Sequence, residues 1–315
     1  MTPRPTDERG TWSVLGALNL DVGCVAPGEV LRGSGDRQVW VDLAATAGGT
    51  GGNLARHLAQ HTDRVVFHAV VGHDAVGEAA IALLRAVMPH DTVRPLVVPG
   101  ADTGLVILLH DDFGQDDPSL ALPRLTLGPN TSAIDLLTPD DVRRALSGHA
   151  SVSHDLVLDG YLLRGDRRQR WLETFGELVT KGWRIHLELV PHTIWRSLTL
   201  GELQRLLRLA ETVSTSLSTL ERVLGAIPTD ALDPDVRAKR LIDLMRRQDV
   251  EHPHRVIARF GWGDGDFAVD STAGSAVLRH YEVDRRFPPK ALGDSLFAAE
   301  LCGAEQPGTA YQLHD

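Results

Sequence analysis

The sequence contains little cysteine and no long apolar run, and both absences narrow the class of protein. Its two cysteines, Cys24 and Cys302, have neither metal-site spacing nor a disulfide pattern, and we interpret them as small buried residues. No run of about 18 apolar residues occurs, and residues 1–10 are polar, without the apolar core of a signal peptide. We therefore expect a soluble, cytoplasmic protein with no membrane partner and with a disordered tail over residues 1–10.

Lysine is also scarce. It occurs only at Lys181, Lys239 and Lys290, and arginine supplies the remaining positive charge. The formal net charge is −10. Nucleic acids and anionic membranes attract basic surfaces, so this charge balance argues against both as partners.

What the sequence does contain is a regular alternation of short apolar runs with amphipathic stretches. Predicted strands over 155–160, 184–190, 212–216 and 255–260 alternate with predicted helices over 167–181, 203–210, 219–224 and 235–247. This order predicts one α/β domain over residues 11–315, with a mostly parallel central sheet covered by helices on both faces.

Polar residues stand at the end of the first predicted strand. Residues 12–25 are typical of a buried strand that opens into Asn19 and Asp21. Ligands of open α/β sheets bind at the carboxyl ends of strands, so both side chains are candidate ligand contacts. A side-chain turn is the alternative role. Residues 29–43, which follow, alternate apolar and polar residues as a half-exposed hairpin would.

Residues 47–59 are typical of a glycine-rich turn that leads into a helix. Its glycines, which include Gly48 and Gly49, let the backbone approach a ligand closely, and Asn53 offers a donor and an acceptor to hydroxyl groups. The pattern is neither a Walker A motif nor a dinucleotide fingerprint. His57 and His61 lie four residues apart but lack a carboxylate partner, so we predict no metal ligands here.

Near the end of the chain, a turn of small residues runs into an alanine-rich helix that Asp294 would open. The amides of Leu292 and Gly293 would form an anion site beside this carboxylate, helped by the helix dipole. Phosphoryl transfer needs both features, a carboxylate to deprotonate a hydroxyl and amides to take up developing charge. A plain helix N-cap is the alternative role of Asp294.

One more glycine-rich turn, over residues 261–266, separates two predicted strands. Gly261 and Gly263 would let it pass close to a nucleotide phosphate, although an ordinary hairpin accounts for the pattern equally well.

Four motifs in this order resemble those of the ribokinase-like (PfkB) carbohydrate kinases. They are Gly16-Ala-Leu-Asn19-Leu-Asp21, Gly48-Gly49-Thr-Gly-Gly-Asn53, Val71-Gly72-His-Asp74-Ala-Val-Gly77 and Gly293-Asp294-Ser295. The resemblance covers the chain from about residue 12. It implies a three-layer α/β/α domain with a small β-sheet lid, built from segments near 26–45 and 93–127 and often used to form a homodimer.

The resemblance also implies a function and its residues. Asn19, Asp21, Gly48, Gly49 and Asn53 would bind a sugar or nucleoside, and ATP with Mg²⁺ would be the phosphoryl donor. Asp294 would be the general base, and the amides of Ala291, Leu292 and Gly293 would form the anion hole.

The donor half departs from the family pattern. Leu292 is bulky for an anion hole, and Lys290 would lend a compensating positive charge. Ser216 and Thr219 stand where the family has Asn-x-x-Glu, and only 21 residues follow Asp294, fewer than the family usually has around the adenine. Three hypotheses follow. The first is a sugar or nucleoside kinase with an unusual donor pocket, and the second is a kinase-like protein that binds a sugar or nucleoside as a sensor without transfer. The third, a fold retained only as a structural partner, is disfavoured because it would leave the polar residues of the acceptor site without a role.

Overall fold

The structure is a computed structural model of the whole chain. It describes all residues except 1–10, 27–39, 63, 112–123, 148–154, 190–197, 227–232, 248–254, 263–264, 273–274, 282–291, 303–307 and 313–315. The predicted tail and most of the predicted hairpin over 29–43 lie outside the described residues.

A ten-stranded sheet forms the centre of the molecule, in the order β14-β13-β12-β11-β10-β9-β8-β1-β4-β5. Neighbouring strands from β5 to β11 are parallel, and β12, β13 and β14 join through antiparallel pairings. The strands are β1 (Trp12–Ala17), β4 (Val65–Gly72), β5 (Val93–Val98), β8 (Asp155–Asp159), β9 (Arg184–Glu188), β10 (Ala210–Ser216), β11 (Arg255–Trp262), β12 (Gly265–Thr272), β13 (Ser275–Tyr281) and β14 (Gly308–Gln312).

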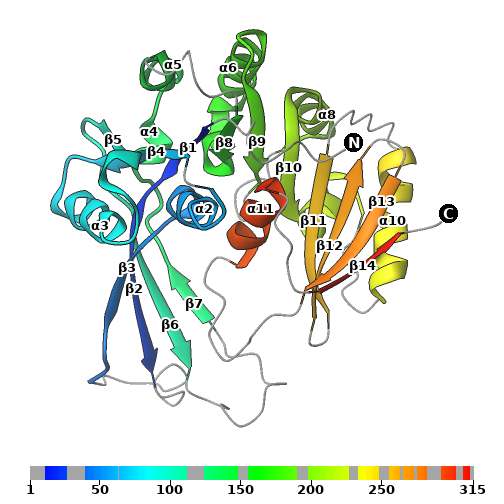
Figure 1. Ribbon diagram of the computed structural model, residues 1–315, viewed down its shortest axis with the longest axis horizontal. Coiled ribbons are helices and arrows are strands. Elements are labelled where there is room, and N and C mark those ends of the chain that lie inside the picture. The colour runs from blue at the N-terminus through cyan, green and yellow to red at the C-terminus, as the bar shows by residue number, and fades with distance from the viewer. Residues whose placement is uncertain are drawn as a thin grey trace.

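Helices cover both faces of this sheet, because successive residues of its strands point to opposite sides. In β1, Val14 packs into one apolar core and Leu15 into the other. One face carries α2 (Thr50–Leu58), α3 (Ala75–Arg85) and α11 (Leu292–Cys302). The other carries α4 (Ala133–Leu136), α5 (Pro139–Ser147), α6 (Arg168–Thr180), α8 (Leu200–Leu209), α9 (Leu217–Val223) and α10 (Pro234–Arg247). The predicted three-layer α/β/α arrangement is therefore confirmed (Figure 1).

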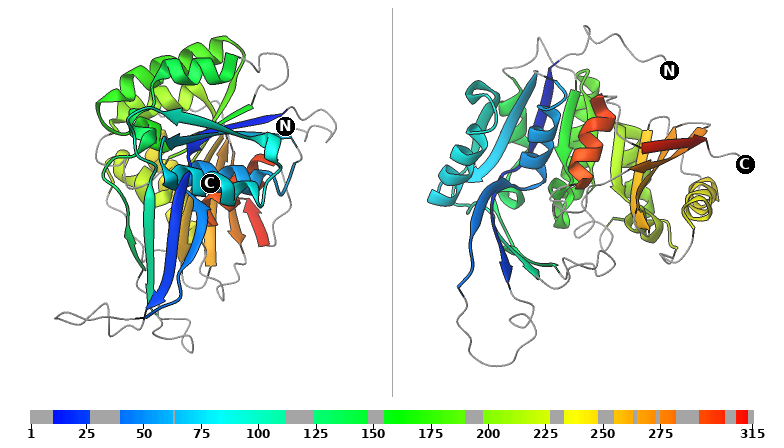
Figure 2. Two further views of the ribbon diagram at one scale, coloured as in Figure 1. Left: turned by 90° about the vertical axis from the view of Figure 1, so that its left-hand side faces the viewer. Right: turned by 60° about the horizontal axis from the view of Figure 1, so that its bottom comes forward.

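A smaller sheet projects away from this body (Figures 1 and 2). Its four strands, in the order β3-β2-β6-β7, are β2 (Asn19–Ala26), β3 (Ala44–Gly48), β6 (Leu105–Asp111) and β7 (Arg124–Leu127). β2 and β6 are parallel, and the two outer pairings are antiparallel. We call these four strands the lid, and they match the small sheet that the sequence predicted.

Two predictions about these strands were wrong. Residues 12–25 form not one strand but two, because the chain leaves the main sheet at Leu18 and enters the lid. The apolar pattern continues through this change of sheet and so could not show it. Residues 93–98, predicted as part of the lid, form β5 and pair with β4 at the edge of the main sheet.

Three short 3-10 helices connect these elements. η2 (His90–Thr92) precedes β5, and η3 (Gly160–Leu163) and η4 (Gly165–Arg167) lie between β8 and α6. Within the described part of the chain, no helix combines the length and the apolar character that crossing a membrane requires.

Candidate active site

Polar and charged side chains gather at the carboxyl edge of the parallel strands. Asp159 and Glu188 are paired at the ends of β8 and β9, and Ser216 is paired with Arg259 across β10 and β11. Parallel strands end at the same edge, so these residues, from distant parts of the sequence, share one region of the sheet.

The start of α2 lies against the end of β1 because glycines permit the contact. A Cβ atom at Gly51 would lie only 2.6 Å from the carbonyl carbon of Gly16. Gly49, the N-cap of α2, has a φ of 80°, a left-handed conformation that favours glycine. Its carbonyl accepts from the backbone N–H of Asn53 at 2.9 Å. The predicted glycine-rich turn thus carries Asn53 to the edge of the sheet.

Asp294 meets Asn53 at this edge. Asp294 lies in the first turn of α11, which begins at Leu292, so it is not the N-cap. Its carboxylate is hydrogen-bonded to the Asn53 side chain. The Asn53 Oδ1 accepts from Arg56 Nη2 at 3.3 Å, which leaves the Asn53 Nδ2 to donate to Asp294. Helices α2 and α11 thereby bring together two residues that are far apart in the sequence.

The charges around Asp294 favour its protonated form. Burial, and next the carboxylate of Glu188, raise the pKa of Asp294 well above its ordinary value, and Asp159 adds to this rise. Arg259 and the Asn53 hydrogen bond oppose it. A carboxylate with a raised pKa is a stronger proton acceptor once it is ionised, which is the property that a general base needs.

The two neighbouring carboxyls are themselves perturbed. Burial raises the pKa of Glu188 to about 7, against the opposing effect of its ion pair with Arg259. Burial also raises the pKa of Asp159 to about 6, although Asp159 accepts from the backbone N–H groups of Tyr161 at 2.9 Å and of Ala17 at 3.1 Å. Asp159 thus joins the end of β1 to the start of η3.

The other predicted acceptor residues lie where the main sheet passes into the lid. Asn19 is paired with Gly48 at the start of β2, and Asp21 lies two residues further along the same strand. A Cβ atom at Gly48 would overlap the Asp21 carboxylate. Gly48 therefore leaves the space that Asp21 occupies, and it is followed directly by Gly49 and α2.

Of the predicted nucleotide contacts, the structure describes only Gly261. Gly261 lies in β11, where it is paired with Asp266 in an antiparallel hairpin with β12, as the alternative interpretation required. Gly263, Lys290 and Ala291 lie outside the described residues, and Leu292 and Gly293 open α11. The structure therefore tests neither the complete anion hole nor Lys290.

Ser216 and Thr219, which stand in place of Asn-x-x-Glu, are hydrogen-bonded to each other. Ser216 caps α9, since its Oγ accepts from the backbone N–H of Thr219 at 3.2 Å and lies 2.7 Å from the Thr219 Oγ1. No group of three or more His, Cys, Asp or Glu side chains that could hold a metal ion occurs among the residues with described positions. These residues do not fit a protein-held Mg²⁺, and we derive no step through such an ion.

Sequence reasoning missed three charged residues of this edge, namely Asp159, Glu188 and Arg259. Asp159 and Glu188 are the last residues of apolar strands and Arg259 lies three residues before the end of one, which is close to the signal that identified Asn19 and Asp21. Applied to β8, β9 and β11, this rule would have found all three.

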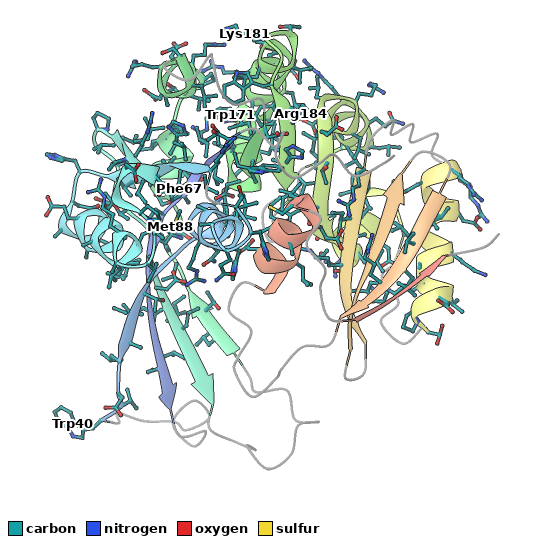
Figure 3. All side chains as sticks on the ribbon, viewed as in Figure 1. Trp40, Phe67, Met88, Trp171, Lys181 and Arg184 are labelled. Atoms are coloured by element: carbon teal, nitrogen blue, oxygen red, sulfur yellow. The ribbon has the colours of Figure 1, made fainter. Side chains whose placement is uncertain are left out.

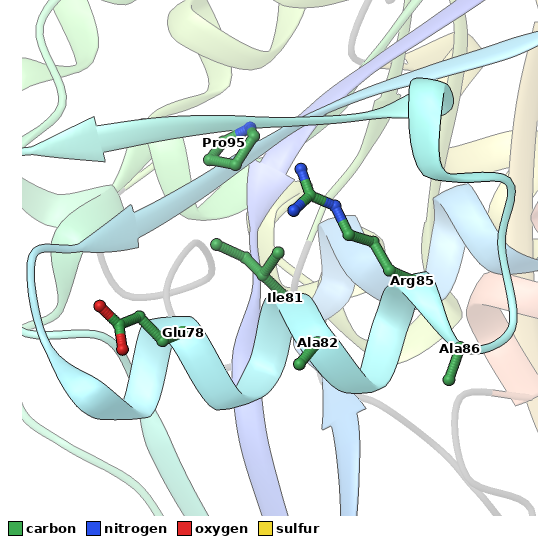
Figure 4. A pocket seen from close by; sticks show the side chains of 6 residues that line it. All are labelled: Glu78, Ile81, Ala82, Arg85, Ala86 and Pro95. Carbon is green, nitrogen blue, oxygen red and sulfur yellow. The ribbon is translucent and has the colours of Figure 1, made fainter.

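A pocket of about 520 Å³ lies elsewhere, between α3 and β5 (Figure 4). Six residues line it: Glu78, Ile81, Ala82, Arg85, Ala86 and Pro95. β5 is the outermost strand at its end of the sheet, so this pocket is separate from the edge that holds Asp294.

Solved structures of sugar kinases share this fold over nearly their whole length. Ribokinase from Giardia lamblia aligns with a TM-score of 0.66 at 16% identity, over 93% of this chain and 83% of that chain. 2-Dehydro-3-deoxygluconokinase from Thermotoga maritima gives 0.64 at 19% identity, over 95% and 89%. A microbiome-derived acarbose kinase gives 0.62 at 15% identity, over 94% and 85%.

No protein-family model matches the chain, and no curated protein matches its sequence. At these identities the likeness establishes the ribokinase-like fold, and the activity has to be inferred from the site.

Proposed function

We propose, starting from the ribokinase-like fold, that this protein is an ATP-dependent phosphotransferase whose acceptor is the hydroxyl group of a sugar or nucleoside. One observation carries the proposal. The carboxylate of Asp294 lies in the first turn of α11, hydrogen-bonded to Asn53, beside the carboxyl edge of the sheet. A base, an amide that binds hydroxyl groups and a helix N-terminus are thus combined in one place.

In the proposed reaction, Asp294 accepts the proton of the acceptor hydroxyl as its oxygen attacks the γ-phosphorus of ATP. The bond from that phosphorus to the bridging oxygen breaks, and ADP leaves with the bond's electron pair. Asn53 keeps the Asp294 carboxylate in place through its hydrogen bond. The backbone amides of Ala291, Leu292 and Gly293 would receive the charge that develops on the transferred group.

Asn19, Asp21, Gly48 and Gly49 are proposed to bind the acceptor. Their positions support this role. Asn19 and Asp21 lie at the start of β2, Gly48 is paired with Asn19 at the end of β3, and Gly49 is the N-cap of α2. Nucleotide contacts are proposed for Gly261, Gly263 and Lys290 from the sequence. ATP would enter as its magnesium complex, with the ion held by the phosphates.

We further propose that the lid forms a homodimer. The support is a row of aliphatic side chains on β6 and β7 that are between 38% and 47% exposed: Leu105, Ile107, Leu125 and Leu127. Ile107 and Leu127 are paired in register, and side chains two apart share one face of a strand. Trp40 is 87% exposed and lies at the far end of the lid (Figure 3). A second copy of the chain would remove this surface from water.

A sensor that binds a sugar or nucleoside without transfer is the second candidate. It is favoured by the donor side, where Ser216 and Thr219 cap α9 and Gly261 lies in an ordinary hairpin. Such a protein would bind one acceptor saturably but would consume no ATP.

The test is phosphoryl transfer from Mg·ATP to a panel of sugars, phosphosugars and nucleosides, followed by mass spectrometry. The Asp294→Asn protein is run alongside as the control. A new phosphorylated product that is absent with the variant supports the kinase and identifies its acceptor. Ligand-induced stabilisation without any product supports the sensor.

A further inference from the structure

Arg259 is a buried cation whose hydrogen-bonding capacity is only partly used. It lies near the end of β11, and its Nη2 forms an ion pair with Glu188. Its Nε and Nη1 are buried and have no hydrogen-bond partner among the residues that the structure describes. A guanidinium carries five N–H donors and no acceptor, so each of these two nitrogens can donate to an acceptor oxygen of a ligand.

Leaving charged donors buried and unpaired is costly, which makes this arrangement informative. Burying a polar group without a hydrogen bond costs about 1–3 kcal/mol, and a charged group costs more. The side chain of Arg259 is 13% exposed, so bulk water does not repay that cost in full. A ligand oxygen that reached Nε or Nη1 would remove the penalty and would bind correspondingly more strongly.

The surroundings indicate the chemical class of that ligand. Three carboxyls, Asp159, Glu188 and Asp294, act electrostatically on one another, and Arg259 is the cation that opposes them at Asp294 and Glu188. Any polyanion that approaches Asp294 meets this negative charge. An oxyanion that accepts from Nε or Nη1 of Arg259 would have its charge neutralised at the point where repulsion is greatest.

The neighbouring strand supplies the second observation. Ser216 is paired with Arg259 across β10 and β11, and its hydroxyl is engaged in capping α9 with Thr219. Neither Ser216 nor Thr219 carries a carboxylate that could organise a metal and the phosphates. Arg259 is thus a positive charge of the protein itself beside the position where the donor phosphates would need one.

We propose that Arg259 binds a phosphoryl oxygen of the nucleotide through its Nε or its Nη1, while Nη2 stays paired with Glu188, and so takes over part of the role that a protein-held metal plays elsewhere. This inference rests on the proposed function. Arg259 would touch the substrate and is a binding residue of the donor, whereas Glu188 is a positioning residue that acts through it.

The test measures the affinity of the protein for ADP in the absence of divalent metal, by isothermal titration calorimetry on the full chain. Arg259→Gln removes the charge and the donors, and we expect ADP to bind about ten- to a hundredfold more weakly. Arg259→Lys keeps the charge but loses the planar fork, and its affinity should lie in between.

The matched control is Arg255→Gln. Arg255 lies at the opposite end of β11 and forms an ion pair with Glu300, so its loss removes a comparable contact far from the carboxyl edge. We expect this variant to unfold at a lower temperature but to bind ADP as the wild type does.

Glu188→Gln gives a prediction of opposite sign. It removes the negative charge that already neutralises part of the charge of Arg259, so ADP should bind more tightly than to the wild type. The loss of a negative charge favours binding of any anion, whether or not Arg259 takes part. If the gain acts through Arg259, it must disappear in the Arg259→Gln/Glu188→Gln double variant. A purely structural ion pair would give loss of stability in both single variants and no gain of affinity in either.

The outcomes separate this inference from the proposed function. Wild type that binds ADP and phosphorylates an acceptor, with an Arg259→Gln variant of equal ADP affinity, overturns the role of Arg259 alone. Wild type that neither binds ADP nor transfers phosphate overturns both. Weakened binding in Arg259→Gln, with Arg255→Gln unchanged, supports both.

Discussion

The two sides of Asp294 are built differently. On the proposed acceptor side, glycines allow β1, β3 and α2 to approach closely, and this approach brings Asn53 to Asp294. On the proposed donor side, Ser216 caps a helix, Gly261 lies in a hairpin, and Arg259 uses only its Nη2 to pair with Glu188. The close approach of the backbone thus characterises the first side, and a guanidinium with two nitrogens that lack a partner among the described residues characterises the second.

This difference matches the sequence, in which the proposed donor half departs from the family pattern. Residues that recognise hydroxyl groups need only correct placement, which the glycine-rich turn and the change of sheet at Leu18 provide. Residues that handle phosphates need positive charge or amides. On the proposed donor side, the described residues include the guanidinium of Arg259, to which we have assigned part of this role.

Replacing Asp294 by Asn should have the largest effect, because this residue joins the two sides. The amide cannot accept the hydroxyl proton, so kcat should fall by about 10²–10⁴. The Kd of the acceptor, measured by calorimetry, should change little, since Asn keeps the size and can still hydrogen-bond Asn53. Full turnover in this variant would remove Asp294 from the mechanism.

Asp159, which joins the end of β1 to the start of η3, gives a prediction about the pH dependence of the free energy of unfolding. Its pKa of about 6 in the folded protein exceeds the unfolded value, so the folded state binds the extra proton. The free energy of unfolding should therefore fall as pH rises from about 4 to about 6, by up to about 1.4 kcal/mol per pH unit from this group. Urea unfolding of Asp159→Asn should lack that part of the fall.

Asp155 is the matched control for this experiment. It lies at the other end of β8, and its pKa is lowered, because hydrogen bonds from His186 and Arg184 outweigh the effect of burial. Its contribution to stability is present above its unfolded pKa and is lost as pH falls further. Asp155→Asn should thus leave the slope between about pH 4 and pH 6 as in the wild type. An unchanged slope in Asp159→Asn would contradict the assignment.

Gly48→Ala tests the acceptor side directly. The new Cβ would overlap the Asp21 carboxylate and displace it. The KM for the acceptor should rise by about ten- to a hundredfold, the cost of losing a hydrogen bond to a charged group, with a smaller change in the KM for ATP. Gly201→Ala, in α8 with no atom close to its Cβ position, should change neither constant and should stabilise the fold slightly. If the two variants had the same KM for the acceptor, the proposed contact of Asp21 with the acceptor would be contradicted.

The smallest effect is expected at Ser216. Removing its hydroxyl in Ser216→Ala takes away the cap of α9, which should cost about 1 kcal/mol in thermal or urea unfolding. Turnover should remain near that of the wild type, because the hydroxyl is engaged in the cap. A large loss of kcat without loss of stability would instead place Ser216 among the phosphate ligands.

Much of the fold could be predicted from the sequence. The strand over residues 155–160 and the helix over 235–247 matched β8 and α10 closely, because apolar periodicity is a local signal. The division of residues 12–25 between two sheets was not predictable, since the apolar run is continuous across Leu18. The assignment of residues 93–98 to the lid failed because partner strands are decided by tertiary pairing.

The site divides in the same way. Asn53 and Asp294 were proposed from local motifs, and the structure brings them into contact. The ion pair of Glu188 with Arg259 depends on the order of β9, β10 and β11 in the sheet, which no local pattern specifies. Charged residues at the ends of apolar strands were the available signal.

The most direct test of the central claim is the pH dependence of kcat for phosphoryl transfer, compared between the wild type and Glu188→Gln. Because burial and Glu188 raise the pKa of Asp294, activity in the wild type should be lost, as pH falls, at a higher pH than an ordinary carboxylate would require. Removing the charge of Glu188 should move this acidic limb to lower pH. An acidic limb in the same place for both proteins would contradict the role of Asp294 as the base within this charge cluster.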